Sequence, residues 1–393
     1  MAETKPADQQ FMQTMNRRLV FRTIVKYSPV SRSEVARMTT LSPSTVTNAV
    51  ADLIQDGLVL EVGVGTSQER GGRRPILLDV MWNARQALSV ALSDRGLSIA
   101  LINMHLDVLW RVFRPLEKGQ DFNAVIDEAI SEVLRMRPKS DGDIVGIGIS
   151  SPGILDRNSL EIMSAASYSW RDVVLGDLQT KYGLPITLEN DVNAAAVGEQ
   201  SRGVAREVDS FAYVMVNSGV GVGVIENRRV MLGHNGWAGE FGHTTIDWNG
   251  EPCLCGSKGC LELYVKWSRV SHTLSEILQK PVTELDDRAI VMKEGLKSGS
   301  LFNKEVRKSA DLLAAGLTSL INLIDPHLIV LDSFFNHVPE FIDWVQEGLL
   351  WRLSNLRNDS IPEVVQSELG DVAPLIGVAS MVLDKADVVS RSG

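Results

Sequence analysis

The sequence predicts an α/β protein with a small helical unit at the N-terminus and a larger part made of two similar lobes. Capped helical patterns fill the segment before Gly57, and strand and crossover patterns then occur twice after Gln86. The charge changes between the two parts, because residues 1–80 carry 10 basic and 8 acidic side chains and the remainder carries 29 and 41. With 393 residues, 44% of them hydrophobic, the chain is long enough for two or three domains.

The first helix is predicted over about residues 16–27, behind a flexible N-terminus at residues 1–15. Its apolar positions have helical spacing, and Ser28-Pro29 ends the pattern. Several basic side chains lie here and just beyond, which suits phosphate contact but is also typical of a solvated helix face. The predicted apolar stripe is Leu19, Val20, Ile24 and Val25.

Two further helices follow, and both have clear start signals. Ser31 and Glu34 form a capping box, which predicts a short helix from Glu34 to about Met38. Ser42-Pro43 places an N-cap serine before a proline at the first helical position, so a third helix is expected from there to Gly57.

The third helix has the features of a DNA-recognition helix. Its exposed face carries short polar side chains near the N-terminus, which suit phosphates and base edges in a major groove. Residues 58–60 and 76–78 are predicted strands that flank a glycine-rich, basic loop, the pattern of a wing. Each helix alone could be an ordinary core helix and the loop a linker, but the ordered set indicates a winged helix-turn-helix domain over residues 16–80. The expected DNA contacts are Arg32, Ser42, Ser44, Thr45, Thr47, Asn48, Arg70, Arg73 and Arg74.

The larger part repeats one α/β theme. The first copy combines a hairpin, a helix and a buried strand, and the second copy begins near Asp209 with successive strands and ends with long helices and another buried strand. Two such lobes would enclose a cleft. The expected elements are strands 88–92, 97–103 and 144–149 with helix 122–136 in the first copy, and strands 211–216, 221–226, 230 and 328–331 with helices up to residue 324 in the second.

The only three cysteines of the chain lie close together and predict a metal site. Cys253, Cys255 and Cys260 follow His243, and the glycines between them permit a tight loop. Three thiolates and one imidazole match the ligands of tetrahedral zinc and leave no open position, so we expect a structural Zn ion. Incidental cysteines or a disulfide are the alternatives, although a disulfide would leave one thiol over.

Carboxylates gather at predicted element ends near the expected cleft. Glu189-Asn190-Asp191 follows a strand at 186–188, Glu240 precedes His243, and Glu262 follows Cys260. Carboxylate and amide oxygens accept hydrogen bonds from vicinal hydroxyls, and amide N–H groups donate to them. Together these groups suit a polyhydroxylated ligand. A zinc ion in the loop would fix the segments of Glu240 and Glu262 relative to each other.

At these motifs the chain resembles the ROK family of bacterial sugar-responsive repressors and sugar kinases. The matching segments are Gly146–Gly153, Glu189–Ala195, Gly236–His243 and the cysteine motif through Glu262. The resemblance implies a two-lobed actin-like, ribonuclease H-like body of the sugar-kinase type over residues 81–393. Its first lobe would comprise about 81–188 plus a C-terminal helix at 373–390, and its second lobe about 189–372 with the zinc loop at 243–260.

The resemblance also implies roles for individual residues. Asn190, Asp191, Glu240, His243 and Glu262 would hold the sugar, and His243 would also bind zinc. In the kinases of the family the residue at the position of Asp191 is the general base that accepts the proton of the sugar hydroxyl. In this chain we expect Asp191 to be a vestigial base that binds a hydroxyl.

The phosphate-binding elements of the family kinases are degenerate here. The position of their Asp-x-Gly-Gly-Thr loop is occupied by Ala91–Arg95, which lacks the metal-side acid and the glycines. Asp332-Ser333-Phe334 stands where the kinases have a glycine pair, and only the glycine-rich turn at 217–223 survives. We therefore expect no kinase activity.

Together these features predict a DNA-binding regulator, by family likeness a repressor of carbohydrate genes. We expect operator DNA and a sugar or sugar phosphate as partners, a homodimer or homotetramer, and a cytoplasmic protein without signal peptide or membrane insertion. Two alternatives stay open. One is an active sugar kinase with a DNA-binding head, and the other is a regulator that answers to a protein of a sugar-transport system.

Overall fold

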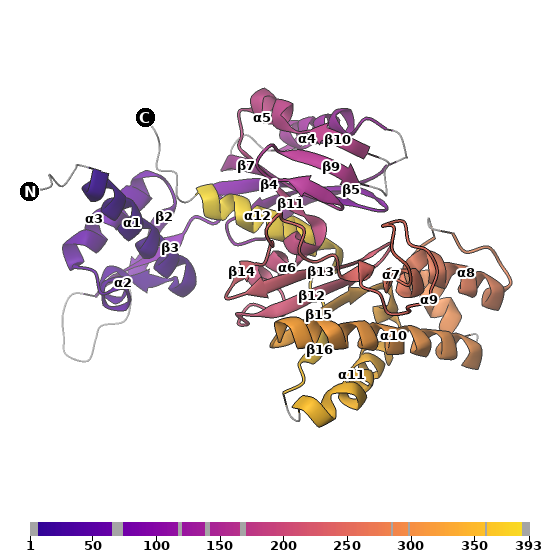
Figure 1. The fold of residues 1–393 in the computed structure, drawn as a ribbon. Helices are drawn as coiled ribbons and strands as arrows, with labels where there is room; N and C mark the ends of the chain where they lie inside the picture. Colours follow the sequence, from indigo (N-terminus) through magenta and orange to yellow (C-terminus); the bar gives the residue numbers. More distant parts are fainter. Residues whose placement is uncertain are drawn as a thin grey trace, which may run out of the picture.

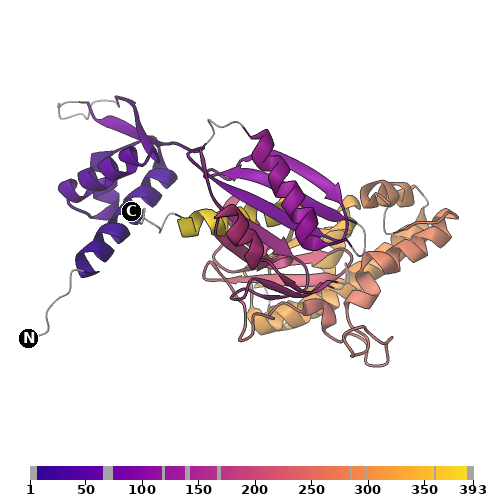
Figure 2. The same cartoon turned by 90° about the horizontal axis from the view of Figure 1, so that it is seen from above.

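A computed structural model of the chain describes residues 7–64, 74–116, 120–137, 142–165, 170–283, 286–297, 299–357 and 360–386. Figure 1 shows a small N-terminal head joined to a larger body of two stacked lobes, and Figure 2 shows the same division from above. The predicted α/β class is confirmed. No helix among the described residues is long and apolar enough to cross a membrane.

The head consists of three helices and a small antiparallel sheet in which β3 lies between β1 and β2. The capping box is confirmed, because Ser31 and Glu34 bond to each other's backbone N–H groups at the start of α2. Ser42 caps α3, and Pro43 is its first residue, as predicted. The elements are α1 (Ala7–Tyr27), β1 (Val30–Ser31), α2 (Arg32–Thr39), α3 (Pro43–Gln55), β2 (Val59–Val64) and β3 (Ile76–Val80).

Helix α1 corrects two expectations. It begins at Ala7, so residues 7–15 are helical and the prediction of a flexible segment up to residue 15 was wrong there. Of the predicted apolar stripe, Val20 and Ile24 are buried, but Leu19 and Val25 are 43% and 37% exposed. The head core is instead completed by Phe21, which lies beside Val20 on the buried side of the helix.

The sheet of the first lobe has the strand order β11-β7-β4-β5-β6. Strands β4, β5 and β6 form an antiparallel meander, and β7 and β11 add to it in parallel. The predicted helix α4 has the expected bounds. The elements are β4 (Arg85–Ser93), β5 (Gly96–Asn103), β6 (Val108–Pro115), α4 (Phe122–Met136), β7 (Asp143–Ser151), β8 (Ile154–Asp156), β9 (Glu161–Ala165), β10 (Trp170–Val174), α5 (Gly176–Tyr182) and β11 (Ile186–Asn190).

The sheet of the second lobe has the order β14-β13-β12-β15-β16. It repeats the first topology, since an antiparallel meander is again extended by two parallel strands. This is the duplicated arrangement expected for a ribonuclease H-like body. The strands are β12 (Phe211–Val216), β13 (Val220–Glu226), β14 (Arg229–Val230), β15 (Leu328–Ser333) and β16 (Glu363–Gln366).

Helices cover the outer face of the second sheet and fill the space between the two sheets. Helix α6 packs on β12 and β13, whereas the C-terminal helix α12 packs on β4 and β7 of the first lobe. The helices are α6 (Asp191–Arg202), α7 (Glu262–Val265), α8 (Trp267–Leu278), α9 (Arg288–Leu296), α10 (Ser300–Ile324), α11 (Phe341–Arg357) and α12 (Ala373–Ala386), with short 3₁₀ turns at η2 (Phe241–His243), η3 (Phe334–His337) and η4 (Gly370–Val372).

Helices α6 and α12 lie against each other between the two sheets. Their backbones approach so closely that a Cβ atom on Gly377 would lie 1.7 Å from the Ala194 carbonyl oxygen, and one on Gly198 would lie 2.2 Å from that of Ala373. A glycine in β7 has the same role, because a Cβ on Gly148 would lie 2.8 Å from Val378. These three glycines therefore fix how the lobes are stacked.

We expect Gly377→Ala to lower the free energy of unfolding of the body by about 1–3 kcal/mol, because the new methyl group has no space and the two helices must separate. Thermal unfolding measures this. Gly176→Ala is the matched control, since its Cβ would meet only Val174 at 4.0 Å. Equal stability of the two variants would contradict the tight contact.

Candidate metal centre and sugar site

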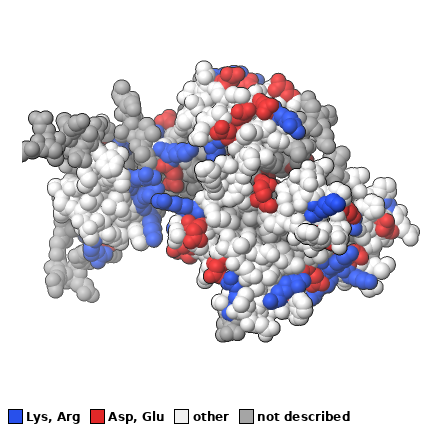
Figure 3. All heavy atoms as spheres, in the orientation of Figure 1, with Lys and Arg blue, Asp and Glu red and all other residues white. Residues whose placement is uncertain are grey.

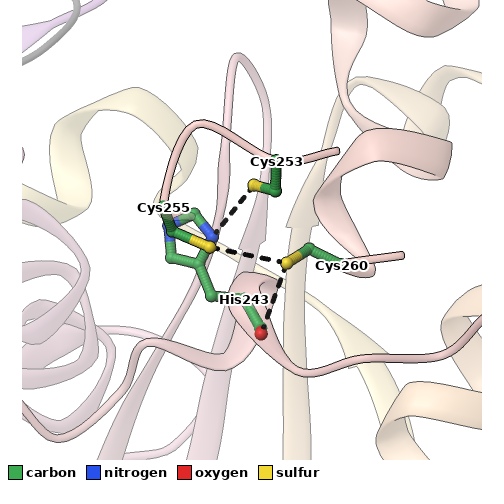
Figure 4. A group of neighbouring side chains, drawn as sticks. All are labelled: His243, Cys253, Cys255 and Cys260. Carbon is green, nitrogen blue, oxygen red and sulfur yellow. Dashed lines mark hydrogen bonds between the residues drawn. The ribbon is translucent and has the colours of Figure 1, made fainter. Parts of the chain in front are cut away.

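The structure brings His243 and the three cysteines into one cluster (Figure 4). Their ligand atoms all lie within 4.8 Å of one another. Cys255 Sγ is 3.7 Å from Cys260 Sγ, and Cys253 Sγ is 3.6 Å from His243 Nδ1. Cys255 is exposed, while Cys253 and Cys260 are buried.

These distances fit a zinc ion. With Zn–S bonds of about 2.3 Å, two sulfur ligands of a tetrahedron lie about 3.8 Å apart, close to the observed separations. The cluster offers three sulfurs and one imidazole nitrogen, which is a closed ligand set. Burial raises the pKa of the Cys260 thiol to about 12, so the protein alone disfavours the thiolate that a bound cation would stabilise. A zinc ion here would link the loop to η2 and supply no reactive water.

The loop that carries the cysteines is shaped by short-range backbone contacts. Isolated bridges pair Thr245 with Cys260 and Pro252 with Lys258. Gly256 and Gly259 have φ values of 91° and 63°, which only glycine adopts readily. The Cys253 N–H donates to the Ser257 carbonyl oxygen at 2.8 Å, which closes the turn between the cysteines.

Two of the predicted sugar ligands lie beside this cluster. Glu262 is the first residue of α7, and its Oε1 lies 3.6 Å from Cys253 Sγ and 3.8 Å from His243 Nδ1. On the other side of the imidazole, His243 Nε2 lies 3.8 Å from Glu240 Oε2. His243 thus presents Nδ1 to the cysteines and Nε2 to Glu240, so one ring belongs to both the metal cluster and the carboxylate group.

Asn190 and Asp191 mark the junction of β11 and α6. The side-chain Oδ1 of Asn190 accepts from the N–H groups of Val192 and Asn193, so it caps the helix, and its side-chain Nδ2 donates to the Gly153 carbonyl oxygen at 3.4 Å. Burial raises the pKa of the Asp191 carboxyl to about 7. The nearby charges of Asp94 and Glu240 add to this increase, although the helix N–H groups oppose it. The structure therefore brings Asp191 and Glu240 into one electrostatic group.

Sequence reasoning missed the residue that orients this junction. Arg157, in the turn after β8, donates from Nε to Glu189 at 3.1 and 3.0 Å. Glu189 is 5% exposed and also accepts from the Asn190 backbone N–H and the Asn193 amide. Since Arg157 lies 32 residues before Glu189 in the chain, no local pattern pointed to it.

A second missed contact joins the two lobes at the turn between β4 and β5. Asp94, in the turn between β4 and β5, forms an ion pair with Arg288 at the start of α9, and the two side chains are 17% and 8% exposed. Arg288 also donates to Asn217 Oδ1 at 3.2 Å and lies over the ring of Trp267. Ala91, near the end of β4, is buried. The β4–β5 turn therefore holds a carboxylate already paired across the lobes.

The predicted DNA contacts differ in how exposed they are and in which neighbours they bond to. Ser44 and Asn48 are exposed on α3, as is Thr47, whose hydroxyl bonds to the Pro43 carbonyl oxygen. Ser42 and Thr45 bond to each other in the helix cap. Arg32 pairs with Glu61 of β2 at 2.8 Å, which leaves it beside that strand. Arg74 is exposed, while Arg70 and Arg73 lie outside the described residues.

Two cavities in the described part of the chain lie away from the candidate sugar residues. One, of about 60 Å³, lies between α8 and α10. The other, of about 320 Å³, lies where the head meets the body.

Comparisons with known proteins agree with this architecture. The model of the ROK family matches residues 96–385. The xylose repressor of Bacillus subtilis (strain 168) is 32% identical over 385 residues, which cover 96% of this chain and 97% of that protein. The DNA-binding transcriptional dual regulator NagC of Escherichia coli (strain K12) is 27% identical over 325 residues, 81% of this chain and 80% of that protein.

Solved structures extend the likeness to the head. The fold is similar to a ROK family transcriptional regulator described as a homolog of the E. coli MLC protein, with a TM-score of 0.81, 24% identity and coverage of 96% of this chain and 97% of that chain. The ROK hexokinase of Thermus thermophilus matches with a TM-score of 0.64 at 25% identity, covering 76% of this chain and 98% of that chain. On the family match and the 32% identity to a full-length relative, this protein belongs to the ROK family.

Proposed function

We propose that the protein is a transcription regulator whose head binds operator DNA and whose body binds a sugar that changes the affinity for that DNA. The observation that carries this proposal is the combination, in one chain, of a three-helix head with a small antiparallel sheet and a two-lobed body in which Asp94 pairs with Arg288 across the lobes. The named repressors among the relatives support repression as the direction.

The effector we propose is a sugar held by Asn190, Asp191, Glu240, His243 and Glu262. The relative with 32% identity is named a xylose repressor, so D-xylose is the first candidate, and N-acetylglucosamine is the second because of the N-acetylglucosamine repressors. Asp191 and Glu240 offer carboxylate oxygens to hydroxyls, and Glu262 is held beside His243. A phosphorylated sugar would have to bring its negatively charged phosphate close to the carboxylates of Asp191, Glu240 and Glu262.

Loss of kinase activity is part of the proposal. ATP-dependent transfer needs a loop that admits phosphate oxygens and a metal ion. Here Ala91 provides no metal ligand, and the carboxylate of Asp94 stands in the loop. An active kinase is the second candidate function, favoured only by the retained Asp191, whose pKa of about 7 would suit a general base.

We also propose that the cluster of His243, Cys253, Cys255 and Cys260 holds a structural zinc ion and that the protein binds DNA as a homodimer or homotetramer. The head would extend to residue 80, with α1 beginning at Ala7, and the body would comprise residues 81–393 with the lobe boundaries expected from the sequence. Paired heads suit a palindromic operator with half-sites a whole number of helical turns apart. A protein of a sugar-transport system remains an alternative effector.

DNA selected by the purified protein from random fragments tests the central proposal. We expect a palindromic site, release of that DNA by D-xylose or N-acetylglucosamine, and weaker binding by Asn48→Ala because the amide no longer meets the groove. Gln55→Ala, exposed at the other end of α3, is the control. If no DNA is selected and ATP together with a sugar yields a phosphorylated product, the kinase alternative holds.

Cys255→Ala tests the zinc site. We expect the bound zinc, measured by atomic spectrometry, to fall from about one ion per chain to none, and thermal stability to fall with it, because three ligands no longer close the site. The exposed neighbour Ser257→Ala should keep the metal. An unchanged zinc content in Cys255→Ala would remove this assignment.

Asp191 predicts a pH dependence of sugar binding. If the ionised carboxylate accepts the hydroxyl hydrogen bond, a pKa of about 7 means that affinity rises about tenfold from pH 6 to pH 8, measured by calorimetry. Because folding raises this pKa from 3.8, the same group makes the unliganded protein less stable as pH rises from about 4 to 7. Asp191→Asn should bind more weakly and lose the slope. A slope that persists in Asp191→Asn would assign it to another group.

A further inference from the structure

Helix α6 extends from the candidate sugar residues toward the head. Its cap is Asn190, its first residue is Asp191, and its last residue is Arg202. Twelve helical residues span about 18 Å. Any displacement of the helix start by a ligand is therefore transmitted along a rigid element to Arg202.

Arg202 holds the turn between β5 and β6. Its guanidinium donates to the His105 carbonyl oxygen and, from Nη2, to Asp107 Oδ1 at 2.6 Å. The turn itself is fixed by Asn103, whose side-chain oxygen accepts from the N–H groups of His105 and Asp107 at 3.0 and 2.9 Å. Arg202 thus contacts a preformed turn at two points.

The same turn contacts the segment that joins the head to the body. The Met104 N–H donates to the Trp82 carbonyl oxygen at 3.0 Å, and the Asn103 amide donates to Asn83 Oδ1 at 2.8 Å. The rings of Trp82 and His105 meet edge to face at 4.7 Å. Since Trp82 and Met104 also pack against the head core, a movement of the turn reaches the head directly.

Helix α12 provides a second contact with the head from the same rigid unit. It is in close backbone contact with α6 at Gly198 and Gly377, and the Ser201 and Ser380 hydroxyls are 3.0 Å apart. Figures 1 and 2 both show α12 extending from the middle of the body to the head. Near its end, Asp384 pairs with Arg22 of α1 at 3.4 Å.

The junction is otherwise loosely filled. The cavity of about 320 Å³ lies between α1, the end of α12 and the β5–β6 turn. Its lining includes Phe21, Leu106 and Leu383, together with Arg17, Arg22 and Arg85. Figure 3 shows basic side chains gathered where the head meets the body. A joint with unfilled volume and exposed ion pairs is repositioned at smaller cost than a close-packed core.

We propose that α6 and α12 move as one body and carry sugar binding at Asp191 to the head, with Arg202 as the positioning residue that sets the β5–β6 turn against the linker. The inference rests on the proposed function and adds its regulation. Arg202 and Asp107 are 33% and 43% exposed, so their ion pair by itself adds little stability. What Arg202 supplies is a fixed geometry between the helix end and the turn.

Arg202→Met tests this inference, because methionine keeps an unbranched stem and removes the guanidinium. Arg357→Met is the matched control. Arg357 makes the same two kinds of contact at the end of α10, an ion pair to Asp325 and a bond to the Ile321 carbonyl oxygen, far from the head. Three quantities are measured in full-length protein: affinity for D-xylose or, if that sugar has no effect, N-acetylglucosamine; affinity for the selected DNA; and the ratio of DNA affinities without and with saturating sugar.

We expect Arg202→Met to keep sugar affinity and sugar-free DNA affinity within about threefold of wild type, while the ratio falls by about 2- to 30-fold. Asp107→Asn should lower the ratio similarly. The ratio in the double variant should be no lower than in Arg202→Met alone, since both substitutions remove the same contact between Arg202 and Asp107. Hydrogen exchange should show that sugar changes protection at residues 81–84 and 103–107 in wild type and in Arg357→Met but not in Arg202→Met.

The outcomes separate the inference from the proposed function. If neither sugar changes DNA binding by the wild type, the proposed function fails and the inference fails with it. If sugar releases DNA from wild type and from Arg202→Met by the same ratio, only the inference is overturned. If Arg357→Met lowers the ratio of DNA affinities as much as Arg202→Met does, the inference is also overturned, because the loss would then reflect a general effect on stability.

Discussion

The contact between α6 and α12 determines how the other parts of the body are placed. A glycine on each helix lets the two backbones meet, and each helix packs on a different sheet. The lobes are therefore joined through a pair of helices whose separation cannot vary by a methyl group without loss of packing. Residues carried by α6 are therefore placed relative to both sheets by these contacts, and this includes the cap at Asn190 and the carboxyl of Asp191.

The candidate sugar site depends on a second constraint, the cluster around His243. Glu240 precedes η2 and Glu262 begins α7, and the segment between them has little regular structure of its own. Without a link between its two ends, ordering that segment would cost the full conformational entropy of its chain. Four ligand atoms lie within 4.8 Å, so the proposed ion would replace many weak contacts and would help this loop to hold two carboxylates beside one imidazole.

The sequence predicted the features that depend on neighbours in the chain. The capping box of Ser31 and Glu34, the start of α3 at Ser42-Pro43 and the spacing of the cysteines are all short-range patterns with a direct physical reading. The extension of α1 to Ala7 was missed because its first turns show no apolar stripe. Leu19 and Val25 fitted the helical period, but they lie at the two margins of the predicted stripe and are exposed, whereas Phe21 is buried with Val20 and Ile24.

Long-range ion pairs could not be predicted in this way. Arg157 with Glu189, Asp94 with Arg288 and Arg202 with Asp107 join residues 32, 194 and 95 positions apart, and each arginine looks like an ordinary surface residue in the sequence. Only the folded chain brings the partners together. Under the proposed function, the Asp94–Arg288 pair is the one of these three contacts that would distinguish a sensor from a kinase, because it lies at the position of the phosphate loop.

The Asp94–Arg288 pair gives this distinction between a sensor and a kinase a basis in electrostatics. A phosphoryl-transfer site must collect positive charge around the transferred group. Here Arg288 is already paired with Asp94, and burial, together with the charges of Asp94 and Glu240, makes ionisation of Asp191 less favourable. The carboxylates therefore oppose a phosphate while they remain good acceptors for neutral hydroxyls. Under the proposed function, a body of this charge would recognise a sugar without delivering a phosphoryl group to it, and the free energy of sugar binding would be available to move the helices that meet the head.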